Sequence, residues 1–568
     1  MELFQKIKLV LPKRTQFHLS NEVKGTTDFG ILTPTLMMEL LPGDRGKISN
    51  ETFWRLHPLL APLMHRCNVY VHNFYIDCNI LWEDYYEFHT GGKDGNFRPV
   101  VPALEIELQM FTIDEIKRWF GPGSLFDYLG FPALTYKSLE EIGSDPVILK
   151  IPLMPFLAFY KVWQYYYADE NLAEMAFDYD YKLSSGIVDI TNRTGVNPLP
   201  LWNSKFKHLF ELQYRAWAKD YFTSALPFPQ RGADVDVPIV GDIPVTGQIG
   251  FKVPDRGGNI SRVVDTLGKP ASNGSLEVHG GYLQDSGQGG VNIDNSNALY
   301  FHDGKADASS ASTITINELR RLFQTQRFEE KMARGGFRPY EYFRNIWGVR
   351  NSDARLQMPK YLGGGRAPVV IGEVLQTSQS MVENTDNPSS LGDMAGRGVS
   401  SAASRGVRFF SEQHGFLLSI SSVIPKAGYQ QGWPRMYDRW EREDYAIPDF
   451  ANLGEQEVKN KELYFDPANA DRKNDETFGY QSRYAEYKYL PSTVHGDFRT
   501  DLAFWHLGRI FNNRPGLNED FVTVKPKDTN RIWAVETANG ARLDHLMYQV
   551  LNDIKIVRPL PKYGTPRL

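Results

Sequence analysis

The sequence predicts an all-β protein in which one β-scaffold carries long loop and helical insertions. Runs of residues typical of strands lie toward both ends of the chain, and irregular or helical segments separate them. A length of 568 residues alone would suggest roughly three or four domains. We give more weight to the strand pattern, because insertions into a single scaffold explain the length equally well.

Four segments are expected to form strands. Residues 29–41 end at the Pro-Gly-Asp turn 42–44, and residues 68–81 alternate between two faces. Residues 407–423 are interpreted as two strands around a His-Gly pair, and residues 545–557 as the last strand before two prolines. These strands would belong to one scaffold formed by both ends of the chain.

Three segments are expected to form helices. Residues 50–64 and 201–219 place large apolar residues at helical spacing. A third helix begins near Ile316, after a Thr-x-x-Glu capping box, and stops at a Gly-Gly pair, 335–336. Helices are therefore fewer than strands in this interpretation.

Cysteine usage and hydropathy indicate a protein made in the cytosol. Cys67 and Cys78 lie eleven residues apart and would point to opposite faces of one strand, so we expect free thiols rather than a disulfide. The first residues are too interrupted by charge for a signal peptide, and lysines and prolines break the most apolar stretch. An aromatic content of 13% suits either extensive subunit contacts or a large β-rich core.

Charge is distributed unevenly in the middle of the chain. Residues 233–310 hold 13 glycines, ten acidic residues and five basic residues, which favours a surface-exposed excursion of short strands and turns. Residues 316–366 hold eleven lysines or arginines against five acidic residues, although the whole chain carries a net charge of -5. Aromatic residues lie between these arginines. This pattern suits a sequence-tolerant contact with single-stranded nucleic acid or a seam between subunits, and both remain open from the residues alone.

The sequence has no motif of an enzyme active site, a metal centre or a cofactor site. H-E-x-x-H, P-loop, G-x-S-x-G and dinucleotide-binding patterns are absent, and the twelve histidines lack metal-ligand spacing. The triple glycine 363–365 is not followed by a helix, so we expect a turn there rather than a phosphate cradle. We predict no catalytic residue, metal ligand or cofactor.

Several blocks of the sequence, in order along the chain, resemble the major capsid protein of microviruses, small single-stranded DNA bacteriophages, in particular the gokushovirus-like branch. The blocks are LLPGDRGKISN (40–50), APLMHRCNVYVHNFYI (61–76), YFTSALPFPQRG (221–232), LRRLFQTQRFEEKMARGG (319–336), DARLQMPKYLGGG (353–365), LGEQEVKNKELY (453–464), FGYQSRYAEYKY (478–489) and NDIKIVRPLPKYG (552–564).

The resemblance implies a viral single jelly roll, an antiparallel β-sandwich with long insertions. Residues 1–232 and 311–568 would form this core, and residues 233–310 would form the variable protrusion at the threefold axes. It further implies a T=1 icosahedral shell around circular single-stranded DNA, located in the virion and assembled in the bacterial host cytoplasm. The implied partners are further copies of the chain, the DNA genome, an internal scaffolding protein, a minor DNA-pilot protein, a small DNA-binding protein and a host-cell surface receptor.

Two sets of residues are candidates for function. The basic residues near the two ends of the chain are candidates to face the DNA: Lys6, Lys8, Lys13, Arg14, Arg558, Lys562 and Arg567. Residues of the basic stretch are candidates for intersubunit contacts: Arg320, Arg321, Arg327, Arg334, Phe337, Tyr340, Phe343 and Trp347. For each arginine, an ion pair within the chain or between subunits is the alternative to a DNA contact.

Two rival functions remain. One is a host-attachment or carbohydrate-binding β-protein of a phage particle, with residues 233–310 as its recognition loop. The other is a β-sandwich glycosidase, which would need a pair of carboxylates in a cleft, and nothing in the sequence supports such a pair.

Overall fold

The computed structural model describes most of the chain outside the central region. The described residues are 14–134, 147–191, 199–232, 245–246, 250–252, 276–279, 282–285, 290–291, 300–302, 305–306, 316–335, 344–345, 357–375, 394–468, 473–535 and 544–562. The chain divides into two compact units, one formed by Met1–Pro229 with Lys331–Leu568 and the other by Gln230–Glu330.

The unit Gln230–Glu330 contains short antiparallel strands. They are β9 (Val245–Thr246), β10 (Gly250–Lys252), β11 (Leu276–His279), β12 (Tyr282–Asp285), β13 (Gly290–Val291), β14 (Tyr300–His302) and β15 (Lys305–Ala306). The pairs are β9 with β15, β10 with β14, and β12 with both β11 and β13. Short strands are what the glycine-rich composition predicts for this segment. Its surface exposure stays a prediction.

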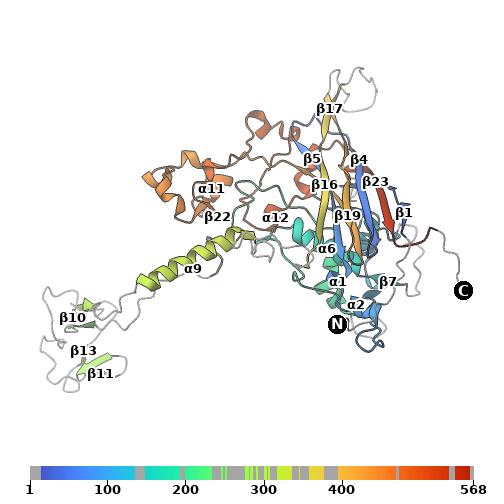
Figure 1. The fold of residues 1–568 in the computed structure, drawn as a ribbon. Helices are drawn as coiled ribbons and strands as arrows, with labels where there is room; N and C mark the ends of the chain where they lie inside the picture. The colour runs from blue at the N-terminus through green and yellow to red at the C-terminus, as the bar shows by residue number, and fades with distance from the viewer. Residues whose placement is uncertain are drawn as a thin grey trace. The chain divides into compact units, whose positions relative to one another are not determined.

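The larger unit is built on two antiparallel sheets (Figure 1). The seven-stranded sheet contains β1 (Thr15–His18), β2 (Asn21–Thr27), β4 (Arg45–Leu56), β17 (Val370–Leu375), β18 (Met394–Ala403), β19 (Val407–Phe410) and β23 (Leu546–Arg558). The four-stranded sheet contains β3 (Thr33–Leu40), β5 (Cys67–Asp77), β16 (Lys360–Pro368) and β20 (Gly415–Pro425).

The chain passes repeatedly from one sheet to the other. In the seven-stranded sheet β23 lies between β2 and β4, and β4 lies between β23 and β18. The order in the other sheet is β16-β5-β20-β3. The strands β2, β3, β4 and β5 therefore alternate between sheets, and so do β19, β20 and β23.

The two sheets pack face to face and form a β-sandwich. One apolar cluster joins Trp54 and Val550 of the seven-stranded sheet to Val69 and Val423 of the other. A second cluster is built in the same way and includes Ile48, Ile554, Leu36 and Leu417. The core thus consists of the inward-facing side chains of both sheets.

A buried polar chain, which we call the asparagine bridge, also spans the space between the sheets. Ser419 Oγ donates to Asn73 Oδ1 (2.5 Å), Asn73 Nδ2 donates to Asn50 Oδ1 (2.8 Å), and Asn50 Nδ2 donates to Asn552 Oδ1 (2.9 Å). Asn552 Nδ2 then donates to the backbone oxygen of Thr35 (3.0 Å), which returns the chain to the four-stranded sheet. The four side chains are at most 1% exposed, so these hydrogen bonds satisfy groups that have lost their contact with water.

A helical layer covers the outer face of the four-stranded sheet. Its elements include α1 (Cys78–Leu81), α2 (Tyr85–Thr90), α3 (Ile113–Phe120), α4 (Leu125–Tyr128), α6 (Met154–Tyr166), α7 (Leu199–Leu201), the π-helix η3 (Trp202–Phe206) and α8 (Lys207–Phe210), with a small sheet of β6 (Ala103–Glu107), β7 (Ile148–Pro152) and β8 (Ile187–Ile190). Phe74 and Leu418 pack against this layer, so the four-stranded sheet is buried on both faces.

Several strand predictions are confirmed. Residues 29–41 contain β3, residues 407–423 contain β19 and begin β20, and residues 545–557 coincide with β23. The run 68–81 is strand only up to Asp77 and then forms α1. Cys67 and Cys78 are free and buried, as expected, and burial raises the pKa of each thiol to about 12.

The predicted helix over residues 50–64 is wrong, because residues 45–56 form strand β4. Every second side chain from Asn50 to Leu56 is buried between the sheets, a period of two. Pairing with β18 and β23 on its two sides holds this segment extended, whatever its local spacing of apolar residues.

The predicted helix over residues 201–219 ends early, at Phe210. The following residues are held extended by backbone hydrogen bonds to distant segments, including Trp217 N to Val522 O (2.8 Å).

The triple glycine is also not a turn, because it lies inside β16. A Cβ atom at Gly364 would lie 2.1 Å from the backbone oxygen of Val71 in β5, so only glycine allows this close pairing of the two strands.

We predict that Asn73→Leu lowers the free energy of unfolding by about 1–3 kcal/mol, because Asn50 and Ser419 would lose a partner while staying buried. Urea denaturation of the purified chain measures this change. Asn96→Leu, at an exposed loop position, is the matched control and should be nearly neutral. A variant at Asn73 that is as stable as the parent would contradict a role for the bridge in stability.

We also predict that stability falls as the pH drops from about 6.5 toward 4. Burial lowers the pKa of both His65 and His72 to about 4, and the charge of Arg215 adds to the effect at His72. Both imidazoles are therefore neutral in the folded chain and take up protons more readily when unfolded. Unfolding midpoints measured at pH 7.5, 6 and 5 should fall, and His72→Gln should flatten the profile. An unchanged profile for this variant would argue against His72 as a cause.

Candidate assembly site

A loop-rich lobe, residues 433–468 and 473–490, lies beside the two sheets in the larger unit (Figure 1, orange, around α11 and β22). Its regular elements are the short helices η5 (Arg435–Tyr437), η6 (Arg442–Asp444), η7 (Pro448–Asn452), η8 (Ala485–Tyr487) and α11 (Asn460–Leu463), with the hairpin β21 (Glu455–Lys459) and β22 (Thr477–Ser482). We call these residues the lobe.

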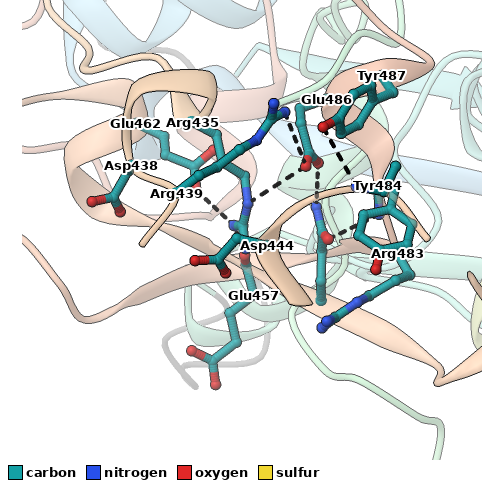
Figure 2. A network of polar contacts seen from close by, with 12 residues as sticks. Arg435, Asp438, Arg439, Asp444, Glu457, Glu462, Arg483, Tyr484, Glu486 and Tyr487 are labelled. Carbon is teal, nitrogen blue, oxygen red and sulfur yellow. Dashed lines mark hydrogen bonds and ion pairs between the residues drawn. The ribbon is translucent and has the colours of Figure 1, made fainter. Parts of the chain in front are cut away.

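A network of ion pairs lies inside the lobe (Figure 2), beside buried apolar residues such as Val458 and Leu463. Arg435 Nη1 lies 3.0 Å from Glu462 Oε1, and its Nε lies 3.9 Å from Glu486 Oε1. Arg439 Nη2 lies 3.6 Å from the same oxygen of Glu486. The side chains of these four residues are 3% to 19% exposed, so water screens the pairs only weakly.

A second ionic group fixes the segment around Asp438. Its carboxylate lies 3.1 Å from Lys459 Nζ and 2.9 Å from Lys461 Nζ, and Lys461 also pairs with Asp475 at 2.7 Å. Burial would raise the pKa of Asp438, but hydrogen bonds from Lys461, Trp440 and Lys459 hold it at about 2. The carboxylate is therefore ionised at neutral and mildly acidic pH.

Large apolar side chains cover the outside of the same lobe. Trp440 is 81% exposed and Leu490 is 93% exposed. Seven others are between 44% and 61% exposed: Trp433, Met436, Tyr437, Tyr445, Leu453, Tyr487 and Tyr489. The guanidinium of Arg439 joins the outside to the ionic interior, because it lies 4.3 Å from the ring centroid of Tyr487 and 5.6 Å from that of Tyr445.

The lobe thus combines buried ion pairs with a large exposed apolar area, and charged residues such as Glu441 and Glu443 are exposed as well. A fully exposed large side chain presents about 150–250 Å², so the nine apolar residues present roughly 1,000 Å². A typical monomer has a largest apolar patch of about 300–600 Å², and a standard interface takes about 800 Å² from each partner. The summed exposed apolar area of the lobe is therefore comparable to one side of a standard protein interface.

The residues predicted to make intersubunit contacts have different surroundings in the structure. Arg320, Arg321 and Arg327 are exposed on α9 (Ile316–Gly335), whose bounds match the helix predicted there. Arg334 near its end forms an ion pair with Glu455 of the lobe, whose side chain is 4% exposed. Phe337, Tyr340, Phe343 and Trp347 lie outside the described residues. An intersubunit role for this set stays a prediction.

The structure brings two of the candidate DNA-facing residues to one edge of the seven-stranded sheet. Arg14 immediately precedes β1, where Thr15 pairs with Arg558 at the end of β23. Arg558 Nε donates to Asp44 (3.0 Å) and its Nη2 donates to the backbone oxygen of Glu39 (2.6 Å), so its main contacts are within the chain. Lys562 is exposed. Lys6, Lys8, Lys13 and Arg567 lie outside the described residues.

The sequence interpretation missed the lobe. Its signal was the dense but non-periodic run of Trp, Tyr, Pro and charged residues from 433 to 450. Such a run predicts neither a helix nor a strand, and only the structure separates its buried charges from its exposed rings.

The described residues contain no group of three or more His, Cys, Asp or Glu side chains that could hold a metal ion. None of the helices among them is long and apolar enough to cross a membrane.

Comparison with known proteins decides the family. Residues 6–568 match the model of the family described as "Capsid protein (F protein)". The chain belongs to this capsid protein family. It is 30% identical to capsid protein VP1 of Bdellovibrio phage phiMH2K over 577 residues, which cover 99% of this chain and 97% of that protein. It is 30% identical to capsid protein VP1 of Chlamydia phage 1 over 617 residues, covering 100% and 97% of the two chains. The identity to capsid protein VP1 of Spiroplasma virus 4 is 26% over 577 residues, covering 98% and 95%.

The resemblance to capsid proteins of gokushovirus-like microviruses is therefore confirmed along the whole chain. As a member of the capsid protein family, the chain is a structural protein of the virion and not an enzyme. Family membership also implies that copies of the chain assemble with one another into a shell.

Glu486→Gln in this capsid protein is expected to destabilise the lobe by about 3 kcal/mol, because it leaves the buried Arg439 without its carboxylate partner. Hydrogen–deuterium exchange over residues 433–490 should accelerate, while exchange in β5 and β20 stays slow. Glu443→Gln removes an exposed carboxylate from the same lobe and serves as the control. Equal exchange in the two variants would show that the ion pairs do not hold the lobe.

Proposed function

We propose that this protein is the major capsid protein of a small phage, and that its copies assemble into a T=1 icosahedral shell around circular single-stranded DNA. The scaffold of each copy is a single jelly roll. Its strand order supports this fold, since the four strands β2-β23-β4-β18 face β3-β20-β5-β16, and the strands β2 to β5 and β19, β20 and β23 alternate between the sheets. The segments between β5 and β16, and between β20 and β23, account for most of the remaining length.

The observation that carries the assembly proposal is the aromatic exterior of the lobe. An isolated monomer would leave about 1,000 Å² of large apolar side chains in water. Burial of this area would stabilise the protein by about 25 cal/mol per Å². A second copy of this chain is the occupant we propose, because family membership implies contacts between many copies and the area matches one side of a standard interface. The buried ion pairs keep the rings in a fixed arrangement, which lowers the entropy lost on association.

The proposal also covers the surface protrusion, the partner molecules and the place of assembly. The segment 233–310 would form the threefold protrusion and contribute to attachment to a host-cell receptor. An internal scaffolding protein, a DNA-pilot protein and a small DNA-binding protein would be further partners. Assembly would take place in the bacterial host cytoplasm. The support for the protrusion, the further partners and the place of assembly is the membership of this chain in the capsid protein family.

We predict that Trp440→Ser combined with Leu490→Ser abolishes assembly without unfolding the subunit, because both side chains are largely exposed in the single chain. Sedimentation velocity and negative-stain microscopy would measure shells and capsomers, and circular dichroism would verify folding. Phe97→Ser with Ile113→Ser changes two exposed apolar residues outside the lobe (51% and 61% exposed) and is the control. Wild-type yields of shells from the Trp440 and Leu490 double variant would contradict the proposed contact.

A further inference from the structure

The exposed face of the seven-stranded sheet carries a row of basic side chains that the sequence analysis does not single out. Arg408 of β19 is the direct cross-strand partner of Lys47 in β4. Lys47 is also the partner of Lys555 in β23, and Lys555 is the partner of His18 in β1. All four residues are exposed. We call them the cation row, after its arginine and two lysines; it crosses β19, β4, β23 and β1, which lie side by side in Figure 1.

The basic side chains of the row lie opposite one another, and this lowers the stability of the sheet when nothing is bound. Directly opposed cross-strand residues have Cβ atoms about 4.5–5.5 Å apart, and like charges at that position are destabilising. Within the described part of the chain, one carboxylate lies within 4.0 Å of a cation of the row: Asp553, 3.9 Å from Lys555 Nζ. Lys47 and Arg408 have no such neighbour there. The row therefore keeps an excess of positive charge.

Aromatic residues accompany the row on the same face. Arg45 lies two residues from Lys47 on β4, and its guanidinium lies 5.1 Å from the ring centroid of Phe410, two residues from Arg408 on β19. Phe410 is 44% exposed. Basic side chains next to an exposed ring are the elements with which proteins bind single-stranded nucleic acid without reading its sequence.

We propose that the cation row binds the phosphate backbone of single-stranded DNA. Neighbouring strands are about 4.8 Å apart, so the row extends roughly 14 Å across the four strands. That length exceeds a single phosphate group and suits a polyanion that runs across the strands. Ionic contact with phosphates also relieves the repulsion within the row. This inference rests on the proposed enclosure of single-stranded DNA, and it assigns the exposed face of the seven-stranded sheet to the genome.

The test is the triple variant Lys47→Gln, Arg408→Gln and Lys555→Gln in the full chain. Fluorescence anisotropy with a labelled 20-nucleotide oligo(dT) measures affinity from 50 to 300 mM KCl. The slope of log affinity against log salt concentration becomes shallower by about 0.7 for each lost phosphate contact. The triple variant should therefore have a slope shallower by about 2, and its affinity at 100 mM salt should be at least about tenfold lower. Lys93→Gln, Lys117→Gln and Lys150→Gln remove the same charge from exposed positions outside this sheet and should retain the parent slope.

A stability measurement completes the test. Without DNA the triple variant should unfold at the same temperature as the parent or higher, because repulsion between opposed cations has been removed. An unchanged slope and affinity, with shells still forming, would overturn the inference and leave the proposed shell function standing. A parent chain that binds oligo(dT) through the row but never forms shells would instead contradict the proposed function.

Discussion

The asparagine bridge constrains the architecture more than any other interaction, because it ties four strands from both sheets in one register. Asn50 and Asn552 are cross-strand partners in one sheet, and Asn73 and Ser419 are partners in the other. A slip of one residue in any of these strands would turn its polar side chain to the opposite face of its sheet and leave buried partners unsatisfied. Apolar contacts alone tolerate small shifts, whereas this chain of donors and acceptors does not.

The same register aligns the proposed cation row. Lys47 lies three residues before Asn50 on β4, and Lys555 lies three residues after Asn552 on β23, so the pairing that aligns the asparagines also aligns the cations on the other face. In the lobe, buried ion pairs lie beneath exposed aromatic rings. One part of the molecule therefore presents charge and another presents apolar area, which fits the two proposed contacts, one with a polyanion and one with other copies of the chain.

The sequence was a good guide to the strands at the two ends of the chain and to the helix from Ile316, since their periodicity or end signals are strong. It failed for β4, where large apolar residues coincide with helical spacing and only pairing with β18 and β23 decides the conformation. The candidate surfaces were harder to predict. The cation row is formed by single basic residues from four strands, up to several hundred residues apart, and strand register brings them together. Nothing local marks Lys47 or Arg408 as members of a common site.

The position of β23 has a consequence for how the chain acquires its structure. This strand lies between β2 and β4, inside the seven-stranded sheet rather than at its edge, although it follows both of them in the chain by several hundred residues. The hydrogen bond from Ser20 to Asp553 joins residues 533 positions apart. During translation β2 and β4 lack their common neighbour until β23 has been synthesised, so the sandwich closes only after several hundred further residues have been added. Until then the two-sheet core of the subunit is incomplete, and contacts between copies that depend on this core must form later.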